Sequence, residues 1–447
     1  MTSRALAAWN LGPVIPAYVR IPGRRSPSRD ADRKETVTVA EVSGVSREAP
    51  GEWPVVILSG GVTGLGVLRA FSRSGIRAYV FPAVRDDLIC RSRWFAPLPG
   101  TTPLASAPRP SLELLERVLR ESGLPRAYLC ACSDDWNKVV AEFVERGSER
   151  FISVVPPRAA LETLQNKARL AQLLARLGVP MPNTRLIESA ADVEVLPPSD
   201  ETFYFLKPTD SQSFLAHFGT KGLRVRTAEE ARRRLDEVLA AGMSVVLQEY
   251  IPGSFDEHYF VDGYVDRAGT VKALFPRRRL RIYPPDFGNS TFMVSVPLAE
   301  VAGALDTVRK VLGEVAYRGI FSAEFKRDPR DGQFKLLEVN ARPWWFIDFA
   351  VRCGVDVCRL AYEDALGRPV PAVEHYRVGA KCIYPYYDFF AMQPLVKHGR
   401  ASWRRWPGDV LPALQPVGCW DDPLPGIVGF TRVLSAAFAH RLSGTKS

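Results

Sequence analysis

The segment 322-SAEFKRDPRDGQFKLLEVNARPWW-345 has the pattern of a β-hairpin. Two runs rich in apolar residues, Phe321–Arg327 and Gln333–Val339, are predicted to form its strands. Between them stands Asp-Pro-Arg-Asp-Gly, a sequence of strong turn formers. The stretch therefore predicts two antiparallel strands joined by a short turn.

Three oxygen-bearing side chains of this hairpin are expected to share one face. If Arg327 pairs with Gln333, the alternation of side chains along a strand directs Glu324, Glu338 and Asn340 to the same side. Carboxylates are costly to bury unless they are paired or bound to metal, and hard oxygen ligands suit Mg²⁺ that carries nucleotide phosphates. From the hairpin alone, a solvent-facing polar strand is an equally good interpretation.

Other motifs upstream of the hairpin separate these alternatives. They are Gln-Asn-Lys at 165–167, Phe-Tyr-Phe-Leu-Lys-Pro at 203–208 and Val-Leu-Gln-Glu-Tyr-Ile-Pro-Gly at 246–253. In this order and at these spacings, together with Glu-Phe-Lys…Leu-Leu-Glu-Val-Asn-Ala-Arg-Pro, they resemble the ATP-grasp superfamily. The resemblance is greatest to ATP-dependent carboligases and the D-aspartate ligase type, and it covers about residues 53–375.

The resemblance implies an α/β (α+β) chain in which an ATP-grasp fold follows a Rossmann-like domain. The expected divisions are a flexible N-terminal extension (1–52), a Rossmann-like pre-ATP-grasp domain (53–150), a lid or nucleotide subdomain (151–255), a metal and catalytic subdomain (256–375) and a C-terminal extension (376–447).

Local patterns in the Rossmann-like segment predict its first elements. Val55–Leu58 has the continuous apolar character of a buried parallel strand, and the glycine-rich run Ser59–Gly66 is expected to be a turn before a helix at Val67–Ser74. Tyr128–Cys132 is predicted to be another strand, followed by a loop at Ser133–Trp136. A glycine-rich turn before a helix also suggests a dinucleotide site, but its spacing is GGxxGxG rather than GxGxxG.

The resemblance assigns phosphate contacts to two lysines and a covering loop. Lys167 is expected to meet the α-phosphate, and Lys207 to bridge the α- and β-phosphates and the adenine edge. Ser211, Ser213 and Lys221 lie in the segment of the phosphate-covering loop, which is less glycine-rich here than in many ATP-grasp proteins. A solvated helix lysine is the ordinary alternative for Lys167.

The adenine and ribose contacts are expected in the next motif. Gln248, Glu249, Tyr250 and Ile251 correspond to the hinge that holds adenine, and Glu257 is placed like the ribose-binding acid of the family. Surface charge is the alternative interpretation for Glu249 and Glu257.

The remaining predicted site residues are metal ligands and arginines. The resemblance implies Mg²⁺, with Mn²⁺ as an alternative, on Glu324, Glu338 and Asn340. Past the predicted strand Thr270–Phe275 lies the basic run Pro276–Arg281, which on its own is typical of a solvated face. The arginines expected to contact the γ-phosphate, the acyl phosphate or a substrate carboxylate are Arg342, Arg279 and Arg281.

These expectations define an ATP-dependent carboxylate–amine ligase that forms an amide through an acyl phosphate and releases ADP and phosphate. One alternative is an ATP-grasp enzyme with carboxylase-like, carbamoyl-phosphate-like or enol-phosphate chemistry. Others are a non-catalytic nucleotide-binding module and a dehydrogenase based on the glycine-rich run. A small-molecule carboxylate and an amine are the expected partners, and a homodimer is compatible with this function.

Composition and residue spacing limit the partners, metals and cellular locations that the sequence suggests. The net charge of +10 suggests nucleic acid, but 47 Arg and 12 Lys are spread among 49 acidic residues, so nucleic acid is not the expected partner. Seven cysteines without a CxxC pair indicate reduced thiols in a cytoplasm, and five histidines without HxxxH spacing argue against zinc. No apolar run reaches the roughly 18–20 residues of a membrane span. A basic amphipathic helix is predicted at Val428–Leu442, where packing on the core or a subunit interface is preferred over a membrane surface.

Overall fold

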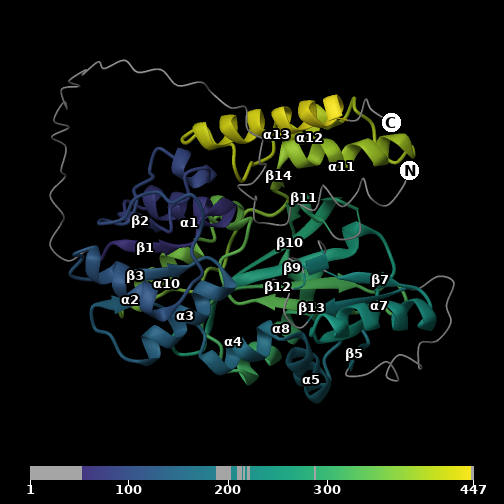
Figure 1. The fold of residues 1–447 in the computed structure, drawn as a ribbon, viewed down its shortest axis with the longest axis horizontal. Helices are drawn as coiled ribbons and strands as arrows, with labels where there is room; N and C mark the ends of the chain where they lie inside the picture. The colour runs from purple at the N-terminus through teal and green to yellow at the C-terminus, as the bar shows by residue number, and fades with distance from the viewer. Residues whose placement is uncertain are drawn as a thin grey trace, which may run out of the picture.

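A computed structural model of the chain describes residues 53–187, 203–208, 214, 217–218, 222–285 and 288–443, with only the backbone of 434 and 436–443. The described residues form three β-sheets with helices around them, and a layer of helices from the C-terminal part lies along one edge (Figure 1). The predicted extension at 1–52 and the predicted phosphate-loop residues Ser211, Ser213 and Lys221 lie outside the described residues.

The first sheet is parallel and has the strand order β2-β1-β3-β4. Apolar side chains cover both of its faces, with α1 on one side and α2 and α3 on the other. Its elements are β1 (Val55–Leu58), α1 (Gly61–Arg73), β2 (Ala78–Phe81), the 3₁₀ helix η2 (Leu88–Arg91), α2 (Leu112–Glu121), β3 (Ala127–Ala131), α3 (Asp134–Glu145) and β4 (Phe151–Ile152).

Two predictions in this unit were wrong about where helices begin. Helix α1 starts at Gly61, so the glycine-rich run belongs to its first turns rather than to a preceding turn. The Asp87 carboxylate accepts a hydrogen bond from the Gly61 N–H at 2.6 Å, which stabilises this early start. Likewise, α3 begins at Asp134 inside the predicted loop, because the Ser133 side chain caps it by accepting from Trp136 N–H.

The second sheet is small and antiparallel, with the order β5-β8-β6-β7. Two helices precede it, and the second begins at the Asn166 cap and ends at Gly178 in the left-handed conformation. The elements are α4 (Arg158–Gln165), α5 (Lys167–Leu177), β5 (Thr184–Ile187), β6 (Tyr204–Pro208), β7 (Leu223–Val225), α7 (Ala228–Ala240) and β8 (Val245–Glu249).

The third sheet is antiparallel, with the order β13-β12-β9-β10-β11-β14. One face packs on α8, α4 and α5 through an apolar core, and part of the other packs on the first unit. The elements are η4 (Phe255–Glu257), β9 (His258–Val265), β10 (Val271–Tyr283), β11 (Asn289–Ser295), η5 (Leu298–Val301), α8 (Ala302–Glu314), β12 (Gly319–Arg327), β13 (Phe334–Asn340) and β14 (Lys381–Ile383). The basic run is therefore part of β10, which extends well beyond the predicted Thr270–Phe275.

The hairpin β12–β13 forms as predicted, but its register differs from the predicted one. Arg327 pairs with Phe334 rather than with Gln333. Between Phe325↔Leu336 and Glu324↔Glu338 the register shifts by one residue, which leaves Leu337 without a partner as a β-bulge. Without this bulge Glu324 would face Leu337, so the extra residue is what sets the two carboxylates opposite each other.

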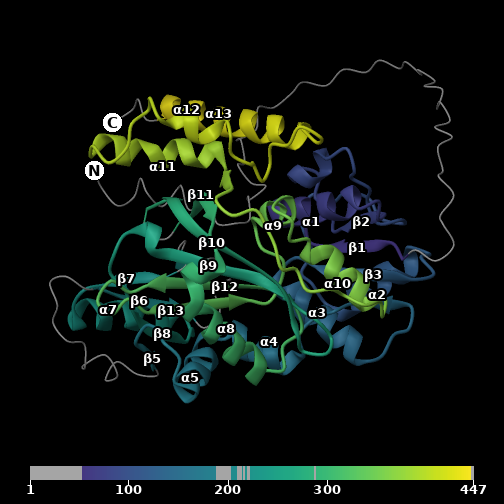
Figure 2. The ribbon, with the colours of Figure 1, turned by 180° about the vertical axis from the view of Figure 1, so that it is seen from behind.

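The C-terminal part joins the units. Helices α9 (Ile347–Arg352) and α10 (Val357–Ala365) contribute to the core beneath α1, and α11 (Pro385–Lys397), α12 (Trp406–Val410) and α13 (Leu424–Ser443) form the edge layer (Figures 1 and 2). Gly66 allows α1 to approach α9 closely, because a Cβ there would lie 2.8 Å from the Ile347 side chain.

The predicted helix at Val428–Leu442 is present as part of α13. None of the helices in the described ranges combines the length and the apolar character that crossing a bilayer would require. All seven cysteines fall within these ranges as free thiols.

A buried ion pair fastens the C-terminal segment to α1. Arg69 and Asp422 are fully buried, and Arg69 Nε donates to Asp422 Oδ2 at 2.9 Å. Arg69 also donates to the carbonyls of Pro416 and Val417, while Asp422 accepts from Ser92 Oγ. The buried charges of Arg69 and Asp422 are thus compensated by contacts between the first and last parts of the described chain.

We expect Arg69→Met to lower the free energy of unfolding by about 3 kcal/mol, because it leaves Asp422 buried without its counter-charge. Urea denaturation followed by tryptophan fluorescence measures this change. Arg109→Met, at an exposed position, is the matched control and should change the stability by less than about 0.5 kcal/mol. Equal stability of the two variants would mean that the ion pair does not hold the segment in place.

Candidate active site

The centre of the candidate site is the face of the third sheet that carries Glu324 and Glu338. These two residues are direct cross-strand partners, and Asn340 stands opposite Ser322 one pair further along the same face. The Asn340 amide donates to Glu338 Oε1 at 3.0 Å. The structure therefore brings the three predicted metal ligands together, as the sequence indicated.

A histidine and an arginine contact the Glu324 carboxylate. His258 Nδ1 lies 3.1 Å and Arg279 Nη2 lies 3.4 Å from Glu324 Oε1. Burial raises the pKa of Glu324, but the hydrogen bond from His258 and the charge of Arg279 outweigh it and lower this pKa to about 2. Burial and the neighbouring Arg279 lower the pKa of His258 to about 4, so the imidazole is neutral near pH 7. Glu324 is consequently ionised near pH 7.

The chemistry of this donor set fits a divalent cation. Two carboxylates directly opposite each other on adjacent strands repel, which destabilises a sheet unless a cation lies between them. Glu338 is exposed, so its oxygens are accessible, and the amide oxygen of Asn340 adds a third hard ligand. Among the described residues no group of three or more His, Cys, Asp and Glu side chains forms a metal cluster.

Strand β6 supplies Lys207, and the first turn of α5 supplies Lys167. Lys207 Nζ donates to Gln248 Oε1 at 2.6 Å, and Gln248 in turn donates to Thr184 Oγ1 at 3.0 Å. Burial lowers the pKa of Lys207, Glu338 raises it and Lys167 lowers it further. Lys207 therefore interacts electrostatically with Glu338, Lys167 and Glu324.

Aromatic rings flank the predicted adenine hinge. Tyr250 stacks on Phe203 with ring centroids 4.1 Å apart, and Phe205 meets Tyr250 edge to face at 5.7 Å. Arg224 lies 3.6 Å above the Phe203 ring. Ile251, which follows Tyr250, is buried. These contacts pack the hinge against β6, with Lys326 Nζ 4.3 Å from the centroid of the Tyr250 ring.

Lys326 links this hinge to the metal-ligand strand, and the sequence interpretation did not include it. It is two residues beyond Glu324 on the same face of β12 and is almost fully buried. Its Nζ donates to the Ile251 carbonyl at 2.7 Å, to the Gly253 carbonyl at 3.3 Å and to Tyr250 Oη at 3.2 Å. The one feature of the sequence that could have indicated Lys326 is its position two residues after the predicted metal ligand Glu324, on the same face of the strand.

Arginines of the hairpin hold Glu249 of the predicted hinge and Glu257, the predicted ribose-binding acid. Glu257 accepts two hydrogen bonds from Arg327, at 2.7 and 3.0 Å, and Glu249 Oε1 lies 2.5 Å from Arg330 Nη1. Their predicted nucleotide contacts stay predictions. In this structure both carboxylates tie the hinge to the turn of the hairpin.

Arg342 connects the hairpin to the Rossmann-like unit. Its Nε and Nη2 donate to the two oxygens of Asp134 at 3.0 and 3.2 Å, and Nη2 also reaches Asn340 Oδ1 at 3.3 Å. Burial lowers the pKa of Arg342, but Asp134 outweighs this and raises it. Next to it, the Asn137 amide donates to the Ala341 carbonyl. The end of β13 is therefore fixed against the start of α3.

Arg279 and Arg281 are separated by the structure. Arg279 is on the Glu324 side and donates to Ser290 Oγ at 2.8 Å. A register shift between the two arginines directs Arg281 to the edge helices, where it pairs with Asp388 at 2.9 Å and with Asp409 at 2.9 Å. The structure thus groups Arg279, but not Arg281, with the metal ligands.

The start of α1 does not favour a dinucleotide. The Gly61 N–H, where a phosphate would bind, is taken by the Asp87 carboxylate. An added Cβ at Gly60 would also lie 2.2 Å from Asp87 Oδ2, so this carboxylate fills the space at the helix terminus.

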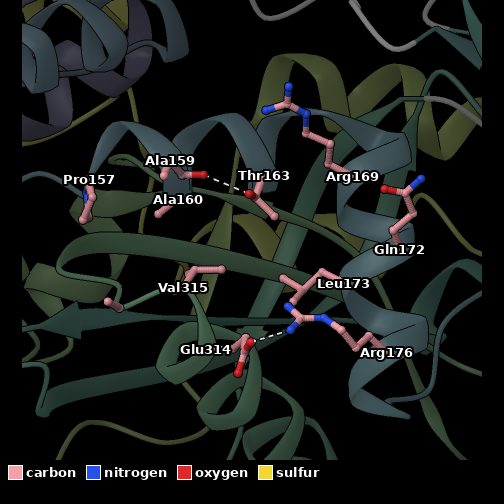
Figure 3. Close-up of a pocket in the computed structure, with 11 residues that line it drawn as sticks. Pro157, Ala159, Ala160, Thr163, Arg169, Gln172, Leu173, Arg176, Glu314 and Val315 are labelled. Carbon is pink, nitrogen blue, oxygen red and sulfur yellow. Dashed lines mark hydrogen bonds and ion pairs between the residues drawn. The ribbon is translucent and has the colours of Figure 1, made fainter.

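A surface pocket lies elsewhere, between α4, α5 and the end of α8 (Figure 3). Arg176 and Glu314 form an ion pair across it at 2.9 Å. It shares no lining residue with the candidate site.

Comparisons with solved structures define the fold. The carboxyaminoimidazole ribonucleotide synthase of Aspergillus clavatus, solved with ATP, matches with a TM-score of 0.54 and 16% identity over 74% of this chain and 80% of that one. The N5-carboxyaminoimidazole synthetase of Staphylococcus aureus with ADP matches with a TM-score of 0.57 and 12% identity over 78% and 87%. The L-amino acid ligase of Bacillus licheniformis matches with a TM-score of 0.53 and 15% identity over 70% and 74%. The chain has the α/β ATP-grasp fold.

Sequence comparison adds one relative. The D-aspartate ligase of Enterococcus faecium is 25% identical over 264 residues, which are 57% of this chain. The match spans 62% of that ligase's length. No protein-family model matches the chain.

We expect Lys326→Met to lower the free energy of unfolding by about 2 kcal/mol, because the Ile251 and Gly253 carbonyls lose a buried donor. Chemical denaturation measures the change. Lys335, which pairs with Lys326 across the hairpin and contacts Asp331 near the surface, is the matched control.

Lys335→Met should cost less than about 1 kcal/mol. If both variants lose the same stability, Lys326 contributes no more than a surface ion pair and does not hold the hinge.

Proposed function

We propose that this chain is an ATP-dependent carboxylate–amine ligase that forms an amide through an acyl phosphate and releases ADP and phosphate. The observation that carries the proposal is the facing pair Glu324 and Glu338 with Lys207 beside it. This arrangement combines an oxygen-rich cation site with a buried positive charge, which is what phosphoryl transfer from ATP requires. The D-aspartate ligase and L-amino acid ligase among the similar proteins support this reaction class.

The proposed reaction has two steps. A carboxylate oxygen of one substrate attacks the γ-phosphorus of ATP, the bond from that phosphorus to the bridging oxygen breaks, and ADP leaves. The amine nitrogen of the second substrate then attacks the acyl carbon. The carbon–nitrogen bond forms, the carbon–oxygen bond to phosphate breaks, and the nitrogen loses one proton.

The chain's own residues stabilise charge in both steps. Lys207 and Lys167 are proposed to hold the phosphates, while the hinge Gln248–Ile251 holds adenine and Glu257 the ribose. Arg279 and Arg342 are proposed to stabilise the transferring phosphoryl group and the acyl phosphate. Each arginine is already positioned by a carboxylate, Arg279 by Glu324 and Arg342 by Asp134. Such preorganised charge costs little to reorient during reaction.

Glu324, Glu338 and Asn340 are the residues that would hold Mg²⁺, and Mn²⁺ suits the same oxygen ligands. When bound, the ion supplies charge neutralisation at the β- and γ-phosphates. It would also offset the repulsion between the two facing carboxylates.

The units take distinct roles in this proposal. Residues 53–150 help to bind the acceptor, residues 151–255 cover the nucleotide and residues 256–375 carry the metal ligands. A homodimer and a cytoplasmic location complete the proposal. The substrates are small molecules, a carboxylate and an amine.

We expect Glu338→Gln to reduce ADP release from Mg-ATP by at least about 100-fold, because it removes a metal-ligand charge at the transferring phosphate. The assay uses pooled amino acids and small carboxylates, with hydroxylamine as a surrogate amine. Carboxylate-dependent hydroxamate from the wild type, absent with the variant, is the expected result. Glu374→Gln, remote in sequence from the predicted motifs, is the control and should retain activity.

Other outcomes of this assay would redirect the proposal. ADP formed without hydroxamate would mean that the phosphoryl acceptor is not a carboxylate, which favours enol-phosphate or carbamoyl-phosphate-like chemistry. Tight ATP binding without turnover in any pool would favour a non-catalytic nucleotide-binding module.

A matched pair of variants separates the two arginines of β10. Arg279→Lys should lower the ligase rate by about 100-fold with little loss of stability, because a lysine cannot reproduce the guanidinium contacts. Arg281→Lys should instead lower the free energy of unfolding by about 2 kcal/mol, because buried Asp388 loses its two-pronged partner. Its rate per folded molecule should stay within about threefold of the wild type.

Initial rates and thermal melts of both variants test this. A rate loss as large in Arg281→Lys as in Arg279→Lys would return Arg281 to the catalytic group.

A further inference from the structure

The layer of helices at one edge of the molecule holds most of the large apolar side chains that the described residues expose. Seven of the nine such side chains occur after residue 388, and they are Phe389, Trp403, Leu411, Trp420, Leu424, Ile427 and Phe430. Trp420 is 98% exposed and Leu411 is 84% exposed. Exposed apolar groups gathered in this way mark an interaction surface rather than random surface composition.

Two sets of these residues lie on neighbouring elements. Phe389, at the start of α11, contacts Trp403 with ring centroids 5.0 Å apart, and Trp403 contacts Trp406 of α12 at 5.9 Å. Leu424, Ile427 and Phe430 are spaced three residues apart on α13 and point away from the core. Both views of the fold place α11, α12 and α13 together along this edge (Figures 1 and 2).

The same edge is strongly basic. Between Phe389 and Gly408 the chain has four cations, Lys397, Arg400, Arg404 and Arg405, and no acidic residue. All four are exposed, and none of the ion pairs between described residues involves them.

The nearest acids in sequence are already neutralised. Asp409 pairs with Arg281 and Lys381, and Asp421 pairs with Arg73. Along this layer of helices, exposed side chains that are apolar, aromatic or positively charged are therefore Phe389, Lys397, Arg400, Trp403, Arg404, Arg405, Leu411, Trp420, Leu424, Ile427 and Phe430. We call these side chains together the basic aromatic edge.

We propose that the basic aromatic edge binds the surface of an anionic lipid bilayer. Tryptophan, phenylalanine and leucine side chains at such a surface enter the boundary between headgroups and acyl chains, while arginine and lysine contact the anionic headgroups. This is attachment to a surface and needs no helix that spans the membrane.

Charge and side-chain type argue against other occupants. In a two-fold symmetric dimer each patch meets its own copy, which would bring the four cations of one chain against those of the other. Nucleic acid would engage the cations and the aromatic rings, but Leu411, Leu424 and Ile427 offer nothing on which a base stacks. A bilayer uses all three kinds of side chain.

The experiment is co-sedimentation of the full chain with vesicles of phosphatidylcholine alone and of phosphatidylcholine with an equal amount of phosphatidylglycerol. We expect binding to the anionic vesicles, weakened by salt, and little binding to the neutral ones. The variant Arg400→Glu/Arg404→Glu/Arg405→Glu should lose at least about tenfold in affinity.

Two further variants make the result specific. Arg109→Glu/Arg117→Glu/Arg120→Glu carries the same charge change on exposed positions of the first unit and should bind anionic vesicles within about twofold of the wild type. Trp420→Ser/Ile427→Ser should lose several-fold in affinity without a change in melting temperature, because both side chains are exposed.

Several results would overturn the proposal. These are no binding to anionic vesicles, equal binding to neutral ones, or an equal loss in the two charge-reversal variants. Binding of single-stranded RNA without vesicle binding would assign the edge to nucleic acid. A dimer that the edge variants dissociate, again without vesicle binding, would assign it to a second copy of the chain.

Discussion

Glu324 and Glu338 project from adjacent strands at directly opposite positions, where their negative charges repel. Hydrogen bonds and positive charges near the two carboxylates offset this repulsion. His258 and Arg279 hold Glu324 from within the sheet, and Lys207 approaches from the second sheet. Side chains from the second and third sheets thus converge on the Glu324 and Glu338 carboxylates. A bound cation would neutralise the remaining negative charge of the two carboxylates, and nucleotide phosphates would pair with the nearby positive side chains.

Much of this arrangement could be predicted from sequence because its parts are local. The strands of the hairpin and the order of the motifs depend on neighbouring residues. The bulge at Leu337 could not be predicted, because a register depends on how two strands twist against each other. The common face of Glu324 and Glu338 was predicted correctly although the register was wrong, because the shift retained their parity.

Contacts between distant segments account for the rest. Nothing near Glu249 in sequence indicates that Arg330 holds it, and nothing near Arg342 indicates Asp134. Likewise, the alternation of side chains along a strand predicted that Arg279 and Arg281 share one face. A register shift between β10 and β11 directs them to different surroundings instead. Helix starts at Gly61 and Asp134 depended on caps from Asp87, which is distant in sequence, and from the adjacent Ser133. Sequence patterns therefore indicated the candidate residues better than their partners.

The buried pair of Arg69 and Asp422 has a consequence for synthesis on the ribosome. Arg69 belongs to the first helix of the described residues, whereas Asp422 and the carbonyls that accept from Arg69 follow it by 347 to 353 residues. Domains generally fold as they emerge, with the N-terminal one first. Here the Arg69 guanidinium of the first unit lacks its final partners until residues 416–422 have been translated. A chain released before Asp422 is made would keep the Arg69 charge without its counter-charge. The first unit of such a chain would therefore be less stable than in the full chain.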